Sequence, residues 1–191
     1  MRLTHSRSVL SFSLDGGYSL RLPAESDLPE LHALVDRNRA YLARWMGWAA
    51  AQTPHDTLEF IRSTRRQFDR NDGFQTAIVD PGEAIVGMIG FHAVSWQDRS
   101  VEIGYWLSAD CQGRGIVTGA TARLVDHAIS EWRLNRVEIR AAVENVRSRA
   151  IPERLGFVAE GTLREAERIG EHYLDLVVYS MLARDWAPSG T

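Results

Sequence analysis

One junction constrains the fold of this chain more than any other feature: a strand that runs into a helix through two glycines. Every second residue of the segment 101–107 is apolar, which predicts a strand with one buried face. From 116 to 132 the apolar residues recur every four positions, which predicts a helix with a broad apolar face. Gly113 and Gly115 lie between them and allow a sharp backbone turn and the close approach of a ligand.

The N-terminus of that helix is a candidate anion site. Its free N–H groups and the helix dipole favour a spread negative charge such as a pyrophosphate, and Arg114 adds a charged donor. An ordinary turn without a ligand is an equally good interpretation of two glycines alone. Two better-known nucleotide loops are excluded, because the chain has no lysine for G-x-x-x-x-G-K-[ST] and no complete G-x-G-x-x-G.

Composition restricts the class of protein. A length of 191 residues, with 45% hydrophobic and 25% charged residues, predicts one domain, residues 1–191, with a sizeable core. The net charge of −3 gives no basic field for nucleic acid. No apolar run approaches the roughly 20 residues that cross a bilayer, and the N-terminus lacks a signal pattern, so we predict a cytoplasmic protein without a membrane partner.

Cys111 is the single cysteine, which excludes an intrachain disulfide and a multi-cysteine metal site. We predict no metal site. We interpret Cys111 as a small residue packed at a turn rather than a nucleophile, because no histidine is near it in the sequence.

Periodicity and turn residues predict an α/β chain. Residues 1–15 show no sustained period, and we expect them to be poorly ordered. Besides the junction, we predict strands at 18–23, 74–80, 84–95, 136–143, from 157 and at 173–181, and helices at 27–46, from 54 and at 148–155.

Two motifs resemble those of a known family. The run QGRGIV at 112–117 resembles the coenzyme-A loop Q/R-x-x-G-x-G/A of the GNAT superfamily of N-acetyltransferases. Val117 departs from the last slot, but a larger apolar residue there is common in the RimJ/RimL branch, and EIGYWL at 102–107 is typical of that branch. The runs NVRS at 145–148 and ERLGF at 153–157 are similar to the second signature, N-x-x-S followed by E-[KR]-x-G-F.

The resemblance implies a GNAT fold, an α/β (α+β) architecture with about four helices and a mixed twisted sheet of about six to seven strands that splays beside the central strand. It implies an acetyl-CoA-dependent N-acetyltransferase that moves acetyl directly to a primary amine in a ternary complex, with a protein N-terminus, ribosomal-protein-like, as first choice of acceptor. The alternatives are a small-amine or antibiotic N-acetyltransferase and a non-catalytic coenzyme-A-binding regulatory protein. The resemblance also implies a homodimer.

The same resemblance implies the contacts of coenzyme A. Pantetheine would insert beside the open strand as an extra strand does, with the backbone of Leu107 as a candidate contact. The remaining predicted contacts are Gln112, Gly113, Arg114, Gly115, Ile116, Val117, Thr118, Asn145 and Ser148.

The implied base is a carboxylate acting through a water, since lysine is absent and no histidine falls at a matching position. Glu167 matches the position of the base in the RimL-like branch, and Glu102 lies where the histone acetyltransferases of the superfamily carry theirs. Both remain open, and either could be an ordinary surface carboxylate paired with an arginine.

The implied acid is Ser148. Many members of the superfamily use a tyrosine four residues before the G-F glycine, but here that slot is Pro152, which cannot donate a proton. In the RimJ/RimL branch the serine of N-x-x-S takes this role, although Ser148 could equally be a helix N-cap. Trp45 and Trp48 fall in the region that lines the family's acceptor site, with core packing as the alternative.

Overall fold

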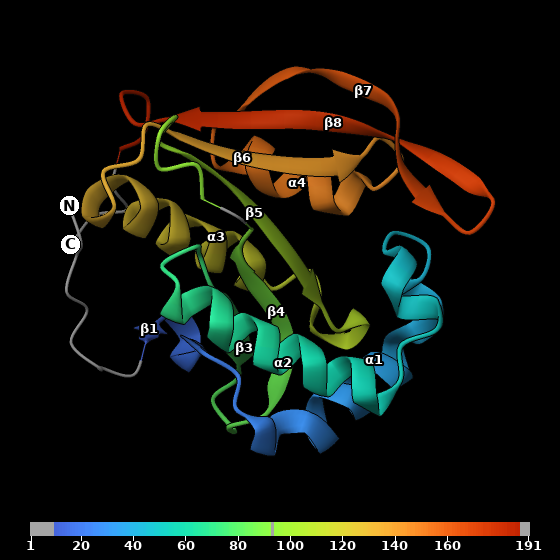
Figure 1. The fold of residues 1–191 in the computed structure, drawn as a ribbon. Helices are drawn as coiled ribbons and strands as arrows, with labels where there is room; N and C mark the ends of the chain where they lie inside the picture. The colour runs from blue at the N-terminus through green and yellow to red at the C-terminus, as the bar shows by residue number, and fades with distance from the viewer. Residues whose placement is uncertain (1–9, 93, 188–191) are drawn as a thin grey trace.

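The computed structural model describes residues 10–92 and 94–187 of the chain. Within them, one mixed sheet has eight strands in the order β1-β2-β3-β4-β5-β6-β8-β7 (Figure 1). The strands are β1 Ser11–Ser13, β2 Ser19–Arg21, β3 Gln75–Val79, β4 Ile85–Phe91, β5 Ser100–Leu107, β6 Arg136–Ala142, β7 Val158–Ile169 and β8 His172–Leu182. The α-helices in this part of the chain are α1 Leu28–Leu42, α2 Pro54–Asp69, α3 Ile116–Asp126 and α4 Val146–Arg154. None of these helices is long and apolar enough to cross a membrane.

The sheet divides at β5. Strands β1 to β5 pair antiparallel in chain order, as the sequence predicts, and β6, β8 and β7 form a second antiparallel group. The two groups are joined by parallel pairing of β5 with β6, which covers only Ser100–Glu102. Figure 1 shows β5 and β6 diverging beyond this short contact. The predicted splay beside the central strand is therefore confirmed.

Some predicted elements need correction. The described strands number eight rather than six to seven, because Ser11–Ser13 pairs with Ser19–Arg21 as an edge strand. Three residues are too few to show a period, so the prediction of a poorly ordered segment 1–15 is wrong at β1, and residues 1–9 lie outside the described part. The strand predicted to reach residue 95 ends at Phe91, leaving a single bridge between Ser95 and Ser100.

Helix α2 begins where its sequence predicts. The Thr53 hydroxyl accepts from the Asp56 N–H at 3.2 Å, and the Asp56 carboxylate accepts from the Thr53 N–H at 2.9 Å, which forms a capping box. Pro54 occupies the first turn, where its missing N–H is not needed.

The helix after the glycines is shorter than predicted. Regular α3 ends at Asp126, and a π-helical turn, His127–Glu131, carries the chain to Trp132. The wider turn lets both rings enter one aromatic cluster, because His127 and Trp132 have ring centroids 4.8 Å apart and each packs against Phe74.

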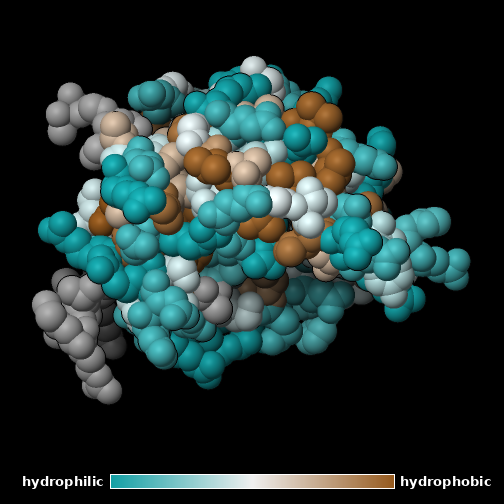
Figure 2. Space-filling model, turned by 90° about the horizontal axis from the view of Figure 1, so that it is seen from above, coloured by the Kyte–Doolittle hydropathy of each residue, from teal (hydrophilic) through white to brown (hydrophobic). Residues whose placement is uncertain are grey.

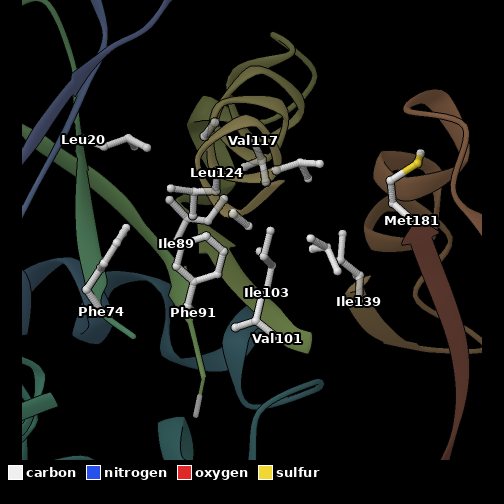
Figure 3. Packing of buried hydrophobic residues seen from close by; sticks show 14 of the residues in the cluster. Leu20, Phe74, Ile89, Phe91, Val101, Ile103, Val117, Leu124, Ile139 and Met181 are labelled. Atoms are coloured by element: carbon white, nitrogen blue, oxygen red, sulfur yellow. The ribbon is translucent and has the colours of Figure 1, made fainter. Parts of the chain in front are cut away.

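The main core lies between the sheet and α3. Its labelled members in Figure 3 come from β2, the residue before β3, β4, β5, β6, β8 and α3 and are buried at 0–8% exposure: Leu20, Phe74, Ile89, Phe91, Val101, Ile103, Val117, Leu124, Ile139 and Met181. A second apolar cluster, which includes Leu31, Ile61 and Met88, packs α1 and α2 on β3 and β4, and the half-buried Trp106 of β5 packs against it. Strand β5 therefore presents one face to each layer.

Candidate active site

A cavity of about 750 Å³ opens where the sheet splays. Its walls come from α1, α2, the segment between them, β5, β6, the first turn of α4 and the middle of β7. Residues far apart in the sequence, such as Trp45, Glu102, Ser148 and Glu167, thus line one space.

The open edge of β5 adjoins this cavity. The Glu102 carbonyl accepts from the His92 N–H at 2.9 Å, and the Ser108 N–H donates to the Val86 carbonyl at 2.8 Å, so the even-numbered positions of β5 bond to β4. Backbone groups alternate along a strand, so those of Tyr105 and Leu107 face the side where described β6 pairing has ended. An extended chain of amide groups fits this edge as an added strand would.

The turn between β5 and α3 fits an anion. Gly113 and Gly115 have φ angles of 77° and 76°, and a Cβ built on either would find no heavy atom within 4 Å. The space that side chains would fill beside Gly113 and Gly115 is therefore open, and Gly115 is the N-cap residue of α3. This cradle fits the pyrophosphate of coenzyme A.

Two arginines flank the turn with neutral partners. Arg114 donates to the Asp110 carbonyl at 3.0 Å, and Arg147 donates to Gln112 Oε1 at 2.5 Å. The bond of Arg147 to a neutral oxygen leaves its charge available to a phosphate, whereas the charge of Arg114 also interacts with the Asp110 carboxylate. Gln112 itself also donates to the Tyr41 hydroxyl, so its side-chain amide connects α1, the turn and α4.

Ser148 is not the N-cap of α4. The cap is Asn145, whose side-chain oxygen accepts from the Ser148 N–H at 3.2 Å. The helix therefore begins two residues before the predicted start, and the hydroxyl of Ser148 is not needed for capping. Asn145 and Ser148 both line the cavity.

A tyrosine that the sequence did not single out holds Ser148. The Ser148 hydroxyl lies 3.3 Å from the Tyr105 hydroxyl, which donates to the Ser148 carbonyl at 3.0 Å. Burial raises the pKa of Tyr105 well above that of an exposed phenol, so the hydroxyl stays protonated. The EIGYWL run contains this residue, but only the fold brings together two positions 43 residues apart.

Glu167 enters the cavity because β7 bulges. Leu163 pairs with Leu176 and Glu167 with Leu174, so four steps along β7 match two along β8. The Asp175 carboxylate accepts from the Glu165 N–H at 2.7 Å, and Glu165 takes a positive φ of 50°. Bulges of this kind redirect side chains beside active sites.

The environment of Glu167 favours a bound proton. Burial raises the pKa of the Glu167 carboxyl above its ordinary value, and the negative charge of Glu102 raises it further. A carboxylate with a raised pKa is a stronger base, so Glu167 suits proton abstraction.

Glu102 has an arginine and a histidine as neighbours. Its carboxylate lies 3.4 Å from Arg140 Nε and 3.9 Å from the ring of His92. Neither neighbour was predicted, and His92 also lines the cavity. His92 follows the end of β4, and its place beside Gly104 comes from the β4–β5 pairing, which the sequence does not state.

Trp45 and Trp48 line the cavity, and Gly47 between them lies against Arg168 and Ile169 at the end of β7. Trp48 is 44% exposed, and its ring centroid is 6.2 Å from that of Trp106 on β5. The core-packing alternative therefore fails for Trp48. Cys111 is half-buried, and burial followed by the charge of Asp110 raises the pKa of its thiol, which disfavours a nucleophilic thiolate.

Comparisons with known proteins agree with this geometry. The sequence matches the family described as "Acetyltransferase (GNAT) domain" over residues 19–158. The "Putative ribosomal N-acetyltransferase YdaF" of Bacillus subtilis (strain 168) is 37% identical over 170 residues, which cover 88% of this chain and 92% of that protein. The "Ribosomal-protein-serine acetyltransferase" of Escherichia coli (strain K12) is 29% identical over 164 residues, 85% of this chain and 91% of that one.

A solved structure shares the whole architecture. The RimL ribosomal L7/L12 alpha-N-protein acetyltransferase in complex with coenzyme A superposes with a TM-score of 0.82 at 27% identity, over 86% of this chain and 93% of that chain. The matched family spans both motif regions and the open edge of β5. The chain therefore belongs to the GNAT acetyltransferase family, in its RimJ/RimL-like branch, and is an acetyl-CoA-dependent N-acetyltransferase.

Proposed function

We propose that this enzyme acetylates the α-amine of a protein N-terminus, with ribosomal proteins as the first acceptor class to test. The main support for a peptide acceptor is the length of the cavity along α2, because Asp56 and Gln67 both line it. Eleven helical residues rise about 16 Å, enough for about five residues of an extended peptide. A small amine would need only the space around Glu167. The names of the two sequence relatives, both ribosomal acetyltransferases, agree with this choice.

Coenzyme A would be held by the elements that form the junction. The turn at 112–118 would bind the pyrophosphate through backbone N–H groups, with Arg114 beside it. The open backbone at Leu107 would bind pantetheine, and Asn145 would contact it from the start of α4. Bound acetyl-CoA supplies the acetyl group as a thioester.

Glu167 would act as the general base, through a water, on the ammonium of the acceptor. Its raised pKa and its position in the cavity support this assignment. Glu102 has an arginine partner at 3.4 Å, and we assign it the role of holding negative charge beside the incoming amine rather than taking its proton.

Ser148 would donate a proton to the departing sulfur. Its hydroxyl lies in the cavity wall on the side of the open β5 edge, where pantetheine would run. Tyr105 would orient that hydroxyl through the 3.3 Å contact and hold the first turn of α4 through its bond to the Ser148 carbonyl. Tyr105 is thus a positioning residue in this mechanism.

Release of free thiol from acetyl-CoA tests the proposal. Peptides with the N-termini of ribosomal proteins should be acetylated with a higher kcat/KM than spermidine, aminoglycosides or other small amines. Turnover of small amines alone would assign the chain to small-amine or antibiotic acetylation. Acetyl-CoA binding without any thiol release above background would make it a coenzyme-A-binding regulatory protein.

We also propose that residues 1–191 act as one acetyltransferase domain in a homodimer. The support is the outer strand β7, which is largely exposed and carries the apolar Val158 and Leu163 at 60% and 42% exposure. Figure 2, viewed from the side where β7 and β8 lie in Figure 1, shows apolar residues among hydrophilic ones on that face. Light scattering after gel filtration decides between monomer and dimer. An enzyme of ribosomal proteins would work in the cytoplasm.

A further inference from the structure

A histidine that lines the cavity has no part in the proposed chemistry. His92 follows β4, and its side chain is 55% exposed, so a bound acceptor can reach it. Its backbone is held in place, because its N–H donates to the Glu102 carbonyl at 2.9 Å. The side chain therefore starts from a defined position beside β5.

A glycine of β5 makes room for the ring of His92. A Cβ built on Gly104 would lie 2.5 Å from Nε2 and 3.3 and 3.4 Å from the two ring carbons bonded to it. These ring atoms are the three heavy atoms nearest to that Cβ. Any other residue at position 104 would therefore displace the imidazole from this face of the sheet.

This face of β5 is the one that an acceptor would approach. Side chains alternate along a strand, so Gly104 and Trp106 share a face, and Trp106 packs against the apolar cluster of α1 and α2. Tyr105 has the opposite orientation, because its hydroxyl reaches Ser148 on α4. Nε2 of His92 thus lies on the α1 and α2 side of the sheet, where the proposed acceptor site is.

Glu102 determines which nitrogen of the neutral ring carries the proton. Nδ1 of His92 is 3.9 Å from Glu102 Oε1, which is longer than a hydrogen bond, so the carboxylate acts on the ring through its charge. Arg140 Nε lies 3.4 Å from the other carboxylate oxygen, so Glu102 is held between the two side chains. A negative charge favours N–H on the nitrogen that faces it, which leaves Nε2 to accept a hydrogen bond.

We propose that His92 contacts the substrate: its Nε2 accepts a hydrogen bond from the amine of the acceptor and turns the lone pair of that amine toward the thioester. One proton of the ammonium passes through a water to Glu167, and a second N–H stays on the nitrogen and donates to Nε2. No bond of His92 itself forms or breaks. This inference deepens the proposed function and rests on it in one respect, because an amine must enter this cavity, whatever the size of the molecule that carries it.

His92→Phe tests the contact, because it keeps a ring and removes both nitrogens. With the acceptor that the parental enzyme uses best, kcat/KM should fall about 10- to 100-fold, the range of one hydrogen bond to a charged group. The dissociation constant of acetyl-CoA should not change. Raising the pH should not restore this variant, whereas it should partly restore Glu167→Gln, because only the latter lacks the base. The matched control is His172→Phe, since this exposed histidine begins β8 outside the cavity, and its kcat/KM should stay within about 2-fold.

Gly104→Ala displaces the ring without removing it. The exposed ring of His92 can swing away from the new methyl group, so the fold should hold while kcat/KM falls as in His92→Phe. In a His92→Ala background the same change at Gly104 should cost less than about 2-fold, because the ring atoms that it displaces are absent.

Thermal melts of each variant check folding. Parental kcat/KM in His92→Phe, or an equal loss from Gly104→Ala with and without the ring, overturns the contact. Recovery of His92→Phe at high pH would make His92 the base and overturns the contact as well. An enzyme that acetylates small amines but no peptide refutes the proposed acceptor, and the same variants then test the contact with that amine. Turnover of no acceptor at all overturns both proposals.

Discussion

Replacement of Glu167 by Gln separates general-base catalysis from binding. Gln keeps the shape of the side chain but cannot accept the proton, and general-base loss costs about 10²- to 10⁴-fold. At 1.36 kcal/mol per tenfold, this is about 2.7 to 5.4 kcal/mol of transition-state stabilisation. We expect that loss in kcat/KM near neutral pH, with no change in the dissociation constant of acetyl-CoA.

The pH profile gives a second readout from the same site. A base acts when ionised, so kcat/KM should rise with pH through the pKa of Glu167, which burial and Glu102 hold above the ordinary carboxyl value. Glu102→Gln removes the like charge and should move this rise to lower pH. Since burial is the larger cause, the pKa of Glu167 should stay above that of an exposed glutamate.

Steady-state rates with one peptide acceptor across pH, on variants of equal thermal stability, provide the assay. Glu171→Gln is the matched control, because this exposed glutamate follows β7 outside the cavity. High pH should partly rescue Glu167→Gln, since more of the amine arrives deprotonated. The reasoning is refuted if Glu167→Gln keeps the parental rate while Glu102→Gln shows both the loss and the rescue, which would make Glu102 the base.

Three further changes test other parts of the structure. Gly115→Glu should abolish the thermal stabilisation by acetyl-CoA, because it adds negative charge to the anion cradle, whereas Gly115→Ala should cost only the strain of the positive φ, about 1–2 kcal/mol, seen in chemical denaturation. Ser148→Ala should lower kcat more than it weakens acetyl-CoA binding, and Tyr105→Phe should lower kcat less; equal turnover in all three enzymes would remove both from the chemistry. Arg136 holds the pKa of Glu160 at about 2, below its unfolded value, so this stabilisation exists above the unfolded pKa and declines as pH falls toward 2. Glu160→Gln should therefore lower the free energy of unfolding near neutral pH by the small amount of an exposed ion pair, up to about 1 kcal/mol, measured by chemical denaturation, and the difference should vanish below pH 2.

Local signals in the sequence predicted most of the framework. The capping box at Thr53, the alternation in β5 and the glycines before α3 each depend on residues that are close together in the chain. Their physical cause can therefore be identified from the sequence. The failures have two other causes: β1 is only three residues long, and the π-helical turn at His127–Glu131 depends on an aromatic cluster assembled from distant segments. Such a cluster leaves no periodic trace in the sequence.

The site residues also divide into those that the sequence indicates and those that only the fold brings together. Resemblance supplied Ser148 and Glu167 as candidates, but it gave no reason for Tyr105, which acts through a contact made across the splayed sheet. Contacts between polar groups from distant parts of the chain are therefore what only the structure reveals.

The position of Glu167 shows why the motif alone is insufficient. With unbroken pairing from Leu163 and Leu176, residue 167 would lie opposite His172, near the end of the β7–β8 hairpin. The bulge instead sets Glu167 opposite Leu174, two residues closer to Leu176, which lines the cavity. Two strand residues span about 7 Å, which is longer than a glutamate side chain. Without the bulge, the carboxylate of Glu167 would therefore not reach the same position in the cavity. The Asp175 carboxylate, which accepts from the Glu165 N–H inside the bulge, thus helps to fix the position of the proposed base.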